Sequence, residues 1–448
     1  MAFEWKPQLL TEIPGPKSKE LLALREQFVS RGPANTAPIF AEEAKGALVR
    51  DVDGNVFIDF AAGIGVVNVG HSPQEIVNAV KEQAEKYLHT CFHVAMYEPY
   101  VRLAEKLTQI TPGSFAKKVM LANSGAEAVE NAVKLARKYT KRTGIIALEC
   151  AFHGRTLMAM TLTSKVKPYK FGFGPFAPEV HKIPSAYCYR CVFGQKYPGC
   201  DLQCVSYLER FFLSECPHEN VAAIIAEPVQ GEGGFIVPPP EYLQGLKAIC
   251  EKYGILLIAD EVQSGFGRTG TMFAVEHFGI EPDMMTLSKS LAAGMPVSAV
   301  VGRAEIMDAA NPGEIGGTFG GNPVSCVAAL KSIELLQRDA LANRANQLGE
   351  ILVQRLKAMQ DKFPLIGDVR GLGAMVAIEL VKDRQTKEPA KEATSKVINS
   401  CVKNGVLALS AGVFSNVVRF LVPLVITEEQ LSMGLDVVER ALEAASLN

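Results

Sequence analysis

Apolar and polar residues follow two alternating periods along most of the chain. From Gln74 onward, helical patterns alternate with short β-branched runs, and this rhythm predicts a mostly parallel sheet with helices on both faces. Ligands of such sheets lie beyond the carboxyl ends of the strands, so we expect the functional site there. The segments that carry the pattern are QEIVNAVKEQAEKYL, KKVMLAN, AVENAVKLARKY, TGIIALE, VAAIIAEPV, EYLQGLKAICEKY, ILLIADEV, MMTLSKS and PVSAVVG.

The pattern changes after GTFGGNP, where VSCVAALKSIELLQ begins a long helix. The strand-like segments VRGLGAMVAIELV and VVRFLVPL and a closing helix follow, which indicates a second, smaller α+β domain. Near the N-terminus, ALVRDVDGNVFIDF is typical of a hairpin with Asp53 and Gly54 in its turn. We therefore predict an N-terminal segment over 1–70 that packs with a small domain over 330–448, and a large domain over 71–329.

Composition narrows the class of protein. The 448 residues are 48% hydrophobic and 21% charged with a net charge of −2, which is typical of a globular protein without a bias toward polyanions or membrane surfaces. We expect neither nucleic acid nor membrane as a partner. The longest apolar runs fall short of the roughly 20 residues that cross a bilayer. The N-terminus lacks a signal-peptide pattern, so a cytoplasmic location with reduced cysteines is expected.

A carboxylate stands at the end of the apolar strand GILLIADEV. Asp260 is followed by Glu261 and then by the glycine-broken loop QSGFGRTG. A carboxylate in such a buried place needs a cationic partner, and the pyridine nitrogen of pyridoxal 5'-phosphate (PLP) is one. Capping a helix or binding a metal would also explain Asp260, so this reading requires a lysine.

Lys289 lies 29 residues after Asp260, in MMTLSKSLAAG, where it follows a short apolar strand and precedes small residues. Most lysines are solvated surface charges. Partial burial instead makes an amine nucleophilic toward an aldehyde, as a PLP enzyme requires. The Asp260 and Lys289 pair together favours a PLP site.

Two segments are candidates for the phosphate of the cofactor. Ser124, Gly125 and Ala126 begin a strongly patterned helix, whose free N–H groups and dipole attract an anion, although Ser-Gly is also a common helix cap. Thr318 lies in GGTFGGNP, where glycines let the backbone approach a ligand and the hydroxyl can donate to phosphate.

CAFHGRT follows the strand IIALE and holds three further candidates. Phe152 and His153 are expected to contact the cofactor, because an aromatic face stacks on a pyridine ring. Arg155 can grip a carboxylate with two hydrogen bonds. Alternatively, Phe152 belongs to the core, and His153 and Arg155 are surface residues.

Taken together in this order and spacing, the motifs resemble the class III (ω-) aminotransferases of PLP fold type I, and most closely the bacterial 4-aminobutyrate aminotransferases. The resemblance covers nearly the whole chain. It implies a large domain with a mostly parallel seven-stranded sheet and a smaller α+β domain. Its carriers are DFAAGIGVVNVGH, NSGAEAVENAVK, FHGRT, EPVQGEGGF, IADEVQSGFGRTG, SKS, GTFGGNP and VVRFLVP.

The resemblance implies roles around the cofactor ring. Lys289 would form the Schiff base and carry the proton, and Asp260 would pair with the pyridinium. Gln263 would donate a hydrogen bond to the phenolic oxygen. Phe152 would stack on one face of the ring, with Val262 on the other.

The resemblance also implies a phosphate site. Ser124, Gly125 and Ala126 would hold the phosphate, joined by Thr318 from a neighbouring subunit, so a homodimer or a dimer of dimers is expected. Where many relatives have serine, this chain has Ala126, so only the backbone N–H remains at that position. Glu227 would be a supporting carboxylate near the cofactor.

Substrate residues follow from the same resemblance. An ω-amino acid and 2-oxoglutarate must share one pocket although they differ in carboxylates. Arg155 would bind the distal carboxylate, and Glu232 would pair with Arg419 and release it when an α-carboxylate arrives. Ile64 would line the pocket beside the substrate methylenes. An ordinary structural salt bridge between Glu232 and Arg419 is the alternative.

Four of the ten cysteines lie in one Pro- and Gly-containing segment, YCYRCVFGQKYPGCDLQC. Cys188, Cys191, Cys200 and Cys204 have a C-x2-C-x8-C-x3-C spacing that can bind zinc or an iron–sulfur cluster. Some 4-aminobutyrate aminotransferases carry a cluster elsewhere in the chain, so that feature does not transfer by position. Reduced thiols or a disulfide are the alternatives.

The function predicted from the sequence is transamination between an ω-amino acid, 4-aminobutyrate or a close analogue, and 2-oxoglutarate. A racemase or epimerase with the same lysine and aspartate is an alternative, as is an aminotransferase for ornithine, acetylornithine or lysine. A non-enzymatic binding protein would have to explain why Lys289, Asp260, Gln263 and two phosphate candidates occur in register.

Overall fold

The structure is a computed structural model that describes residues 5–446. Its contacts divide the chain into a unit of residues 75–345 and a unit made of residues up to 74 and from 346 onward. The sequence pattern predicts domain boundaries between residues 70 and 71 and between residues 329 and 330. Helix α10 (Pro323–Arg338) belongs to the first unit, because it packs against α4 (Glu98–Ile110).

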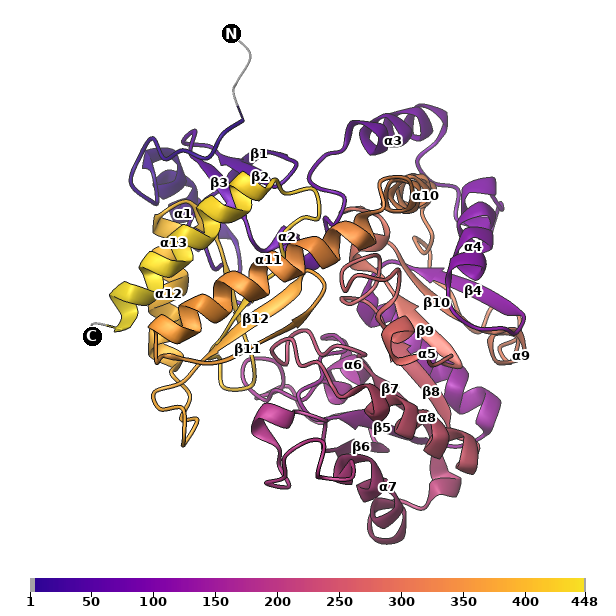
Figure 1. Ribbon diagram of the computed structural model, residues 1–448. Coiled ribbons are helices and arrows are strands. Elements are labelled where there is room, and N and C mark those ends of the chain that lie inside the picture. Colours follow the sequence, from indigo (N-terminus) through magenta and orange to yellow (C-terminus); the bar gives the residue numbers. More distant parts are fainter. Residues whose placement is uncertain (1–4, 447–448) are drawn as a thin grey trace. The chain divides into compact units, whose positions relative to one another are not determined.

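Within the described residues, the unit 75–345 is built on a seven-stranded sheet of order β4-β10-β9-β8-β7-β5-β6, seen at the right of Figure 1. Strand β10 runs antiparallel to both its neighbours, and β9, β8, β7, β5 and β6 pair in parallel. The predicted mostly parallel sheet is therefore confirmed. The strands are β4 (Lys117–Ala122), β5 (Gly144–Leu148), β6 (Val180–Ile183), β7 (Val221–Ala226), β8 (Leu256–Asp260), β9 (Met284–Leu287) and β10 (Ser298–Arg303).

Both faces of this sheet are covered. All six residues of β7 are buried, although successive side chains of a strand point to opposite faces. Helix α5 (Gly125–Thr140) packs on β7, β8, β9 and β10, and α8 (Pro240–Tyr253) packs on β8. The remaining helices of the unit are α3 (Gln74–Lys86), α6 (Leu157–Leu162), α7 (Gln203–Ser214), α9 (Ala304–Met307) and the 3-10 turns η1 (Cys188–Arg190), η2 (His218–Asn220), η3 (Ala274–Phe278) and η4 (Lys289–Leu291).

Helix α5 shows how local sequence starts an element at the site. The Ser124 side chain accepts the Glu127 N–H, and the Glu127 carboxylate accepts the Ser124 N–H, which is a capping box. Apolar residues on one face, among them Val129 and Val133, are buried against the sheet. Lys141 ends the helix in a left-handed conformation.

The other unit carries two four-stranded sheets, of order β1-β2-β3-β13 and β11-β12-β15-β14. The predicted hairpin is β2 and β3, and its turn contains Asp53 and Gly54, with Asp51 Oδ1 accepting the Asp53 and Asn55 N–H groups. Strand β13 pairs in parallel with β3, which joins N-terminal and C-terminal residues in one sheet. Its elements are α1 (Pro16–Phe28), β1 (Ala41–Lys45), β2 (Leu48–Asp51), β3 (Val56–Asp59), α2 (Ala62–Gly65), α11 (Leu341–Lys362), β11 (Ile366–Leu372), β12 (Met375–Leu380), α12 (Lys391–Lys403), β13 (Val406–Leu407), β14 (Leu409–Ala411), β15 (Val417–Phe420) and α13 (Glu428–Ser446).

Among residues 5–446, none of the helices is both long enough and apolar enough to cross a membrane.

Candidate active site

A pocket of about 570 Å³ lies where the strands of the seven-stranded sheet end. Glu227 directly follows β7, Asp260 is the last residue of β8, and Ser288 follows β9. Because these strands are parallel, their carboxyl ends bring the three polar side chains to one edge. The pocket is lined by Gly125, Ala126, Phe152, His153, Gly154, Glu227, Glu232, Asp260, Val262, Gln263, Ser288 and Lys289.

Asp260 is buried and held by three hydrogen-bonding groups. Its Oδ2 lies 2.6 Å from His153 Nδ1, and its Oδ1 accepts the Thr286 hydroxyl at 3.0 Å and the Val262 N–H at 3.2 Å. Asp260 and Thr286 are paired neighbours in the β8–β9 ladder. These contacts to both oxygens fix the position and orientation of the Asp260 carboxyl group at the pocket wall.

Lys289 begins the turn η4, with φ at 49°, in the left-handed region. This conformation is uncommon for a residue with a side chain and is found where surrounding contacts enforce it. The preceding Ser288 is anchored by its hydroxyl, which donates to the Val297 carbonyl at 2.9 Å. The backbone therefore fixes the Cα atom of Lys289 at the pocket wall.

Glu227 is a second buried carboxyl group in the pocket. Burial, the largest cause, and the charge of Asp260 together raise its pKa to about 8. The N–H groups of Phe152 and Gly231, each at 2.8 Å, and the charge of Lys289 act in the opposite direction. At neutral pH Glu227 is therefore protonated in most molecules, and it places no second negative charge beside Asp260.

The first turn of α5 closes one end of the pocket. The Ser124 hydroxyl is used as the helix cap, whereas Gly125 and Ala126 line the pocket with N–H groups that have no acceptor within a helix. A methyl group on Gly125 would lie 2.9 Å from Val262 Cγ1, and one on Gly154 would lie 2.7 Å from Ala126 Cβ. Glycine at both positions therefore lets the helix start approach its neighbours closely, as an anion cradle requires.

Two polar atoms show that the pocket fits a polar ring. His153 Nε2 and Gln263 Oε1 are buried and have no hydrogen-bond partner within the described chain. A buried polar atom without a partner costs free energy unless a ligand supplies one. With Asp260, a lysine and a helix N-terminus in the same pocket, the residues suit PLP, which has a ring nitrogen, a phenolic oxygen, an aldehyde and a phosphate.

Tyr169 connects three side chains near the pocket. Its ring contacts Phe152 edge-on at 5.0 Å, its hydroxyl donates to Glu232 at 3.3 Å, and the Arg155 guanidinium lies 4.7 Å from its centre. Arg155 is exposed and is not among the pocket-lining residues. Its expected carboxylate contact is therefore not preformed in the pocket.

Three further predicted residues are not among those that line this pocket. Thr318 is exposed and lines a separate open pocket with Lys134. Ile64 and Arg419 belong to the other unit, where Ile64 is 45% exposed with a φ of 68°, and Arg419 is buried in β15. A left-handed φ is costly for a β-branched residue, which marks Ile64 as a strained position.

The family model for class III aminotransferases matches residues 29–442. The chain belongs to the class III aminotransferase family. Members use PLP, and the chain is accordingly an aminotransferase of fold type I.

Individual relatives support the same family. The chain is 50% identical over 420 residues to a protein named probable 4-aminobutyrate aminotransferase from Bacillus subtilis, with 94% of this chain and 96% of the relative covered. It is 46% identical to a 5-aminovalerate aminotransferase from Pseudomonas aeruginosa, covering 95% and 98%. A solved aminotransferase structure from Bacillus anthracis matches with a TM-score of 0.89 and 32% identity, over 96% and 99% of the two chains.

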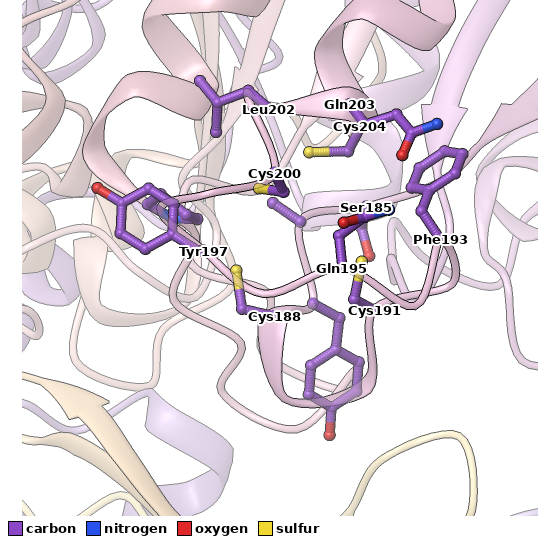
Figure 2. Close-up of a pocket in the computed structure, with 13 residues that line it drawn as sticks. Ser185, Cys188, Cys191, Phe193, Gln195, Tyr197, Cys200, Leu202, Gln203 and Cys204 are labelled. Carbon is purple, nitrogen blue, oxygen red and sulfur yellow. The ribbon is translucent and has the colours of Figure 1, made fainter.

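The cysteine segment forms a separate feature of this aminotransferase. Cys188, Cys191, Cys200 and Cys204 are free thiols that line one pocket of about 380 Å³ (Figure 2). Burial raises the pKa of Cys204 to about 11, and the other three thiols add to the rise. In the described part of the chain, no three His, Cys, Asp or Glu side chains are arranged to hold a metal ion. The expected zinc or iron–sulfur site is thus not preassembled, because the thiols surround a space and do not converge on one point.

Sequence reasoning missed two residues of the site. Thr286 lies inside the apolar run MMTL, and its hydroxyl three residues before Lys289 was the available signal. Tyr169 lies in a segment with no recognised motif, so nothing in the sequence indicated its contacts with Glu232 and Arg155.

Proposed function

We propose that this aminotransferase moves the amino group of an ω-amino acid, 4-aminobutyrate or a close analogue, to 2-oxoglutarate, giving a semialdehyde and glutamate. The observation that carries the proposal is the pocket that gathers Lys289, Asp260 with its three hydrogen-bonding neighbours, and Glu232. The names of the relatives from Bacillus subtilis and Pseudomonas aeruginosa, which refer to 4-aminobutyrate and 5-aminovalerate, support the substrate class.

The residues suit distinct parts of PLP, which when bound supplies an electron sink for the charge left on a substrate carbon. Lys289 Nζ would hold the aldehyde carbon, and the ionised Asp260 would face the ring nitrogen. Gly125 and Ala126 would give N–H groups to the phosphate with Ser124. The Gln263 amide N–H would donate a hydrogen bond to the phenolic oxygen. The Gln263 Oε1 atom has no partner in the described chain, and rotating the amide by half a turn would place the NH₂ group in its position.

The chain's own groups would manage the proton and the charges. The amine of Lys289, once released by the incoming substrate amine, would take the proton from the amine-bearing carbon of the substrate and deliver it to the carbon that had been the aldehyde of the cofactor. His153 and Thr286 would hold the Asp260 carboxyl group in place throughout. Glu227, with its raised pKa, would stay neutral beside them.

We further propose that four side chains let the enzyme distinguish its two substrates. Glu232 would pair with Arg419 when an ω-amino acid is bound and release it for an α-carboxylate, while Arg155 binds the distal carboxylate and Ile64 borders the methylenes. The proposed role of Glu232 is supported by Tyr169, because the Tyr169 hydroxyl donates a hydrogen bond to one oxygen of the Glu232 carboxylate. A structural salt bridge between Glu232 and Arg419 would instead leave substrate choice unaffected by mutation.

A panel of amino donors tests the proposal. Purified protein with added PLP would be mixed with 4-aminobutyrate, 5-aminovalerate, ornithine, acetylornithine and lysine, each with and without 2-oxoglutarate. We expect glutamate to form fastest with 4-aminobutyrate or 5-aminovalerate, and the coenzyme absorbance to change with the donor alone. Exchange of the α-hydrogen with solvent deuterium and no need for a 2-oxo acid would instead identify a racemase or epimerase.

Assembly and location complete the proposal. We expect a homodimer or a dimer of dimers, in which Thr318 serves the site of the neighbouring subunit. The exposure of Thr318 and of the adjacent Phe319, which is 62% exposed, supports an interface here. Light scattering coupled to size exclusion measures the subunit number. A cytoplasmic location is proposed from the ten free cysteines.

A further inference from the structure

Tyr169 lies on the connection between α6 and β6 and contacts two residues of the pocket that holds Lys289. Its ring packs edge-on against Phe152, with the ring centres 5.0 Å apart, and Phe152 lines that pocket. Its hydroxyl donates to Glu232 Oε2 at 3.3 Å, and Glu232 lines the pocket as well. Tyr169 is not itself among the lining residues, so its effect on a substrate passes through the side chains that it touches.

The end of α6 anchors the segment that carries Tyr169. The ammonium group of the next residue, Lys170, donates to the Thr163 carbonyl at 3.2 Å, just beyond the helix. Carbonyls at the end of a helix have no N–H partner within it and attract a cation. The Thr163 hydroxyl also accepts the N–H of His153, the neighbour of Phe152, at 3.0 Å. The same helix end therefore holds the backbone on both sides of the contact between Tyr169 and Phe152.

Arg155 lies over the face of the Tyr169 ring, with its guanidinium carbon 4.7 Å from the ring centre. A guanidinium is attracted to the electron-rich face of an aromatic ring. This attraction restrains Arg155, which is exposed and has a long side chain with many rotamers. One tyrosine thus positions two residues of opposite charge, Arg155 by its face and Glu232 by its hydroxyl.

Glu232 requires a hydrogen-bond donor in each of its two proposed states. In the proposed function, on which this inference rests, Glu232 pairs with Arg419 for an ω-amino acid and releases it for an α-carboxylate. A carboxylate that leaves a cation inside a pocket is costly unless another group donates to it. The Tyr169 hydroxyl donates to Glu232 already, so it is placed to hold the carboxylate after that release.

We propose that Tyr169 is a positioning residue for substrate choice, and that its hydroxyl holds the Glu232 carboxylate while a substrate with an α-carboxylate occupies the pocket. The hydroxyl therefore favours glutamate and 2-oxoglutarate, which carry two carboxylates, over an ω-amino acid, which carries one. The ring serves both kinds of substrate, because it positions Arg155 for the distal carboxylate that both contain.

Two substitutions of Tyr169 separate the hydroxyl from the ring. Each PLP-loaded variant is titrated with glutarate, an unreactive dicarboxylate, and with pentanoate, a monocarboxylate of the same length, and binding is read from the coenzyme absorbance. Tyr169→Phe keeps the ring, so the dissociation constant of glutarate should rise about fivefold and that of pentanoate should stay within about twofold. Tyr169→Leu removes the ring too, so pentanoate should also bind about threefold more weakly.

Turnover should show the same difference between the substrates. In Tyr169→Phe, kcat/KM for 2-oxoglutarate should fall about fivefold, while kcat/KM for 4-aminobutyrate should stay within about twofold. A general loss of structure would lower both values together. The matched control is Tyr197→Phe, which removes a tyrosine hydroxyl that donates to Glu241 at 3.0 Å away from this pocket, and it should change neither value.

A double-mutant cycle asks whether the effect passes through Glu232. In a Glu232→Ala background, Tyr169→Phe should no longer weaken glutarate, because the acceptor of the hydroxyl is gone. Three results would overturn the inference: glutarate binding unchanged in Tyr169→Phe, equal weakening of glutarate and pentanoate by Tyr169→Phe, or the full effect of Tyr169→Phe in the Glu232→Ala background.

The wild-type enzyme separates this inference from the proposed function. If it binds glutarate but uses neither 4-aminobutyrate nor 5-aminovalerate as a donor, the proposed donor is wrong, and the glutarate titrations still decide the role of Tyr169. Titration of the coenzyme absorbance reports only on folded, PLP-loaded molecules, so a variant with a low yield of folded protein still gives its dissociation constants.

Discussion

Replacing Thr286 by valine tests how the fold holds the Asp260 carboxyl group in place. The change removes one hydroxyl, preserves the side-chain volume closely, and suits a strand, since valine favours β structure. Thr286 and Asp260 are both almost fully buried, so water cannot replace the lost donor at 3.0 Å. The structure thus isolates a single hydrogen bond between neighbouring strands.

The expected magnitude follows from the chemistry of that bond. A hydrogen bond to a charged group contributes about 1.5–3 kcal/mol, and about 1.4 kcal/mol corresponds to a tenfold change in rate. His153 Nδ1 and the Val262 N–H remain on the carboxylate, so we expect the lower end. The half-reaction with 4-aminobutyrate, followed by coenzyme absorbance in stopped flow, should slow by about tenfold.

Two controls separate this effect from general destabilisation. Thr286→Ser keeps the hydroxyl and should retain a rate within about twofold of wild type. Thr394→Val removes a buried hydroxyl of α12 that donates to the Ala390 carbonyl at 2.9 Å, and it should lower the melting temperature without slowing the half-reaction. If the Thr286→Val enzyme, fully loaded with PLP, reacts as fast as wild type, the hydroxyl does not support Asp260 and the reasoning is wrong.

Three further changes address the neighbouring groups. Lys289→Ala should abolish turnover, with a loss of at least about a thousandfold, and mass spectrometry after borohydride reduction should find no coenzyme attached to the chain. Because the pKa of Glu227 is raised from 4.5 to about 8, the folded protein holds the proton of this carboxyl group more tightly than the unfolded chain does. Stability of the coenzyme-free protein should therefore fall as pH rises from about 4.5 through about 8, and in Glu227→Gln thermal melts should show a shallower fall. Glu232→Gln should weaken discrimination between 4-aminobutyrate and glutamate as donors, measured as the ratio of their kcat/KM values, and an unchanged ratio would favour a purely structural Glu232.

The sequence by itself determined the elements and the main chemical groups of the site. Short apolar runs such as VAAIIA predict buried strands, because their residues are apolar on both faces and β-branched residues are frequent among them. A carboxylate at the end of such a run, as at Asp260, is costly without a partner, so its position already indicated a ligand. Ser124 before a patterned helix likewise predicted the start of α5.

Tertiary structure decided which of these groups meet. Apolar periodicity gives neither the direction nor the order of strands, so the antiparallel β10 and the pairing of Thr286 with Asp260 required the folded sheet. The pKa of Glu227 depends on burial and on the distance to Asp260, which no local pattern contains. The four loop cysteines share one pocket only because the chain folds back between β6 and α7, and spacing along a flexible loop does not fix distances in space.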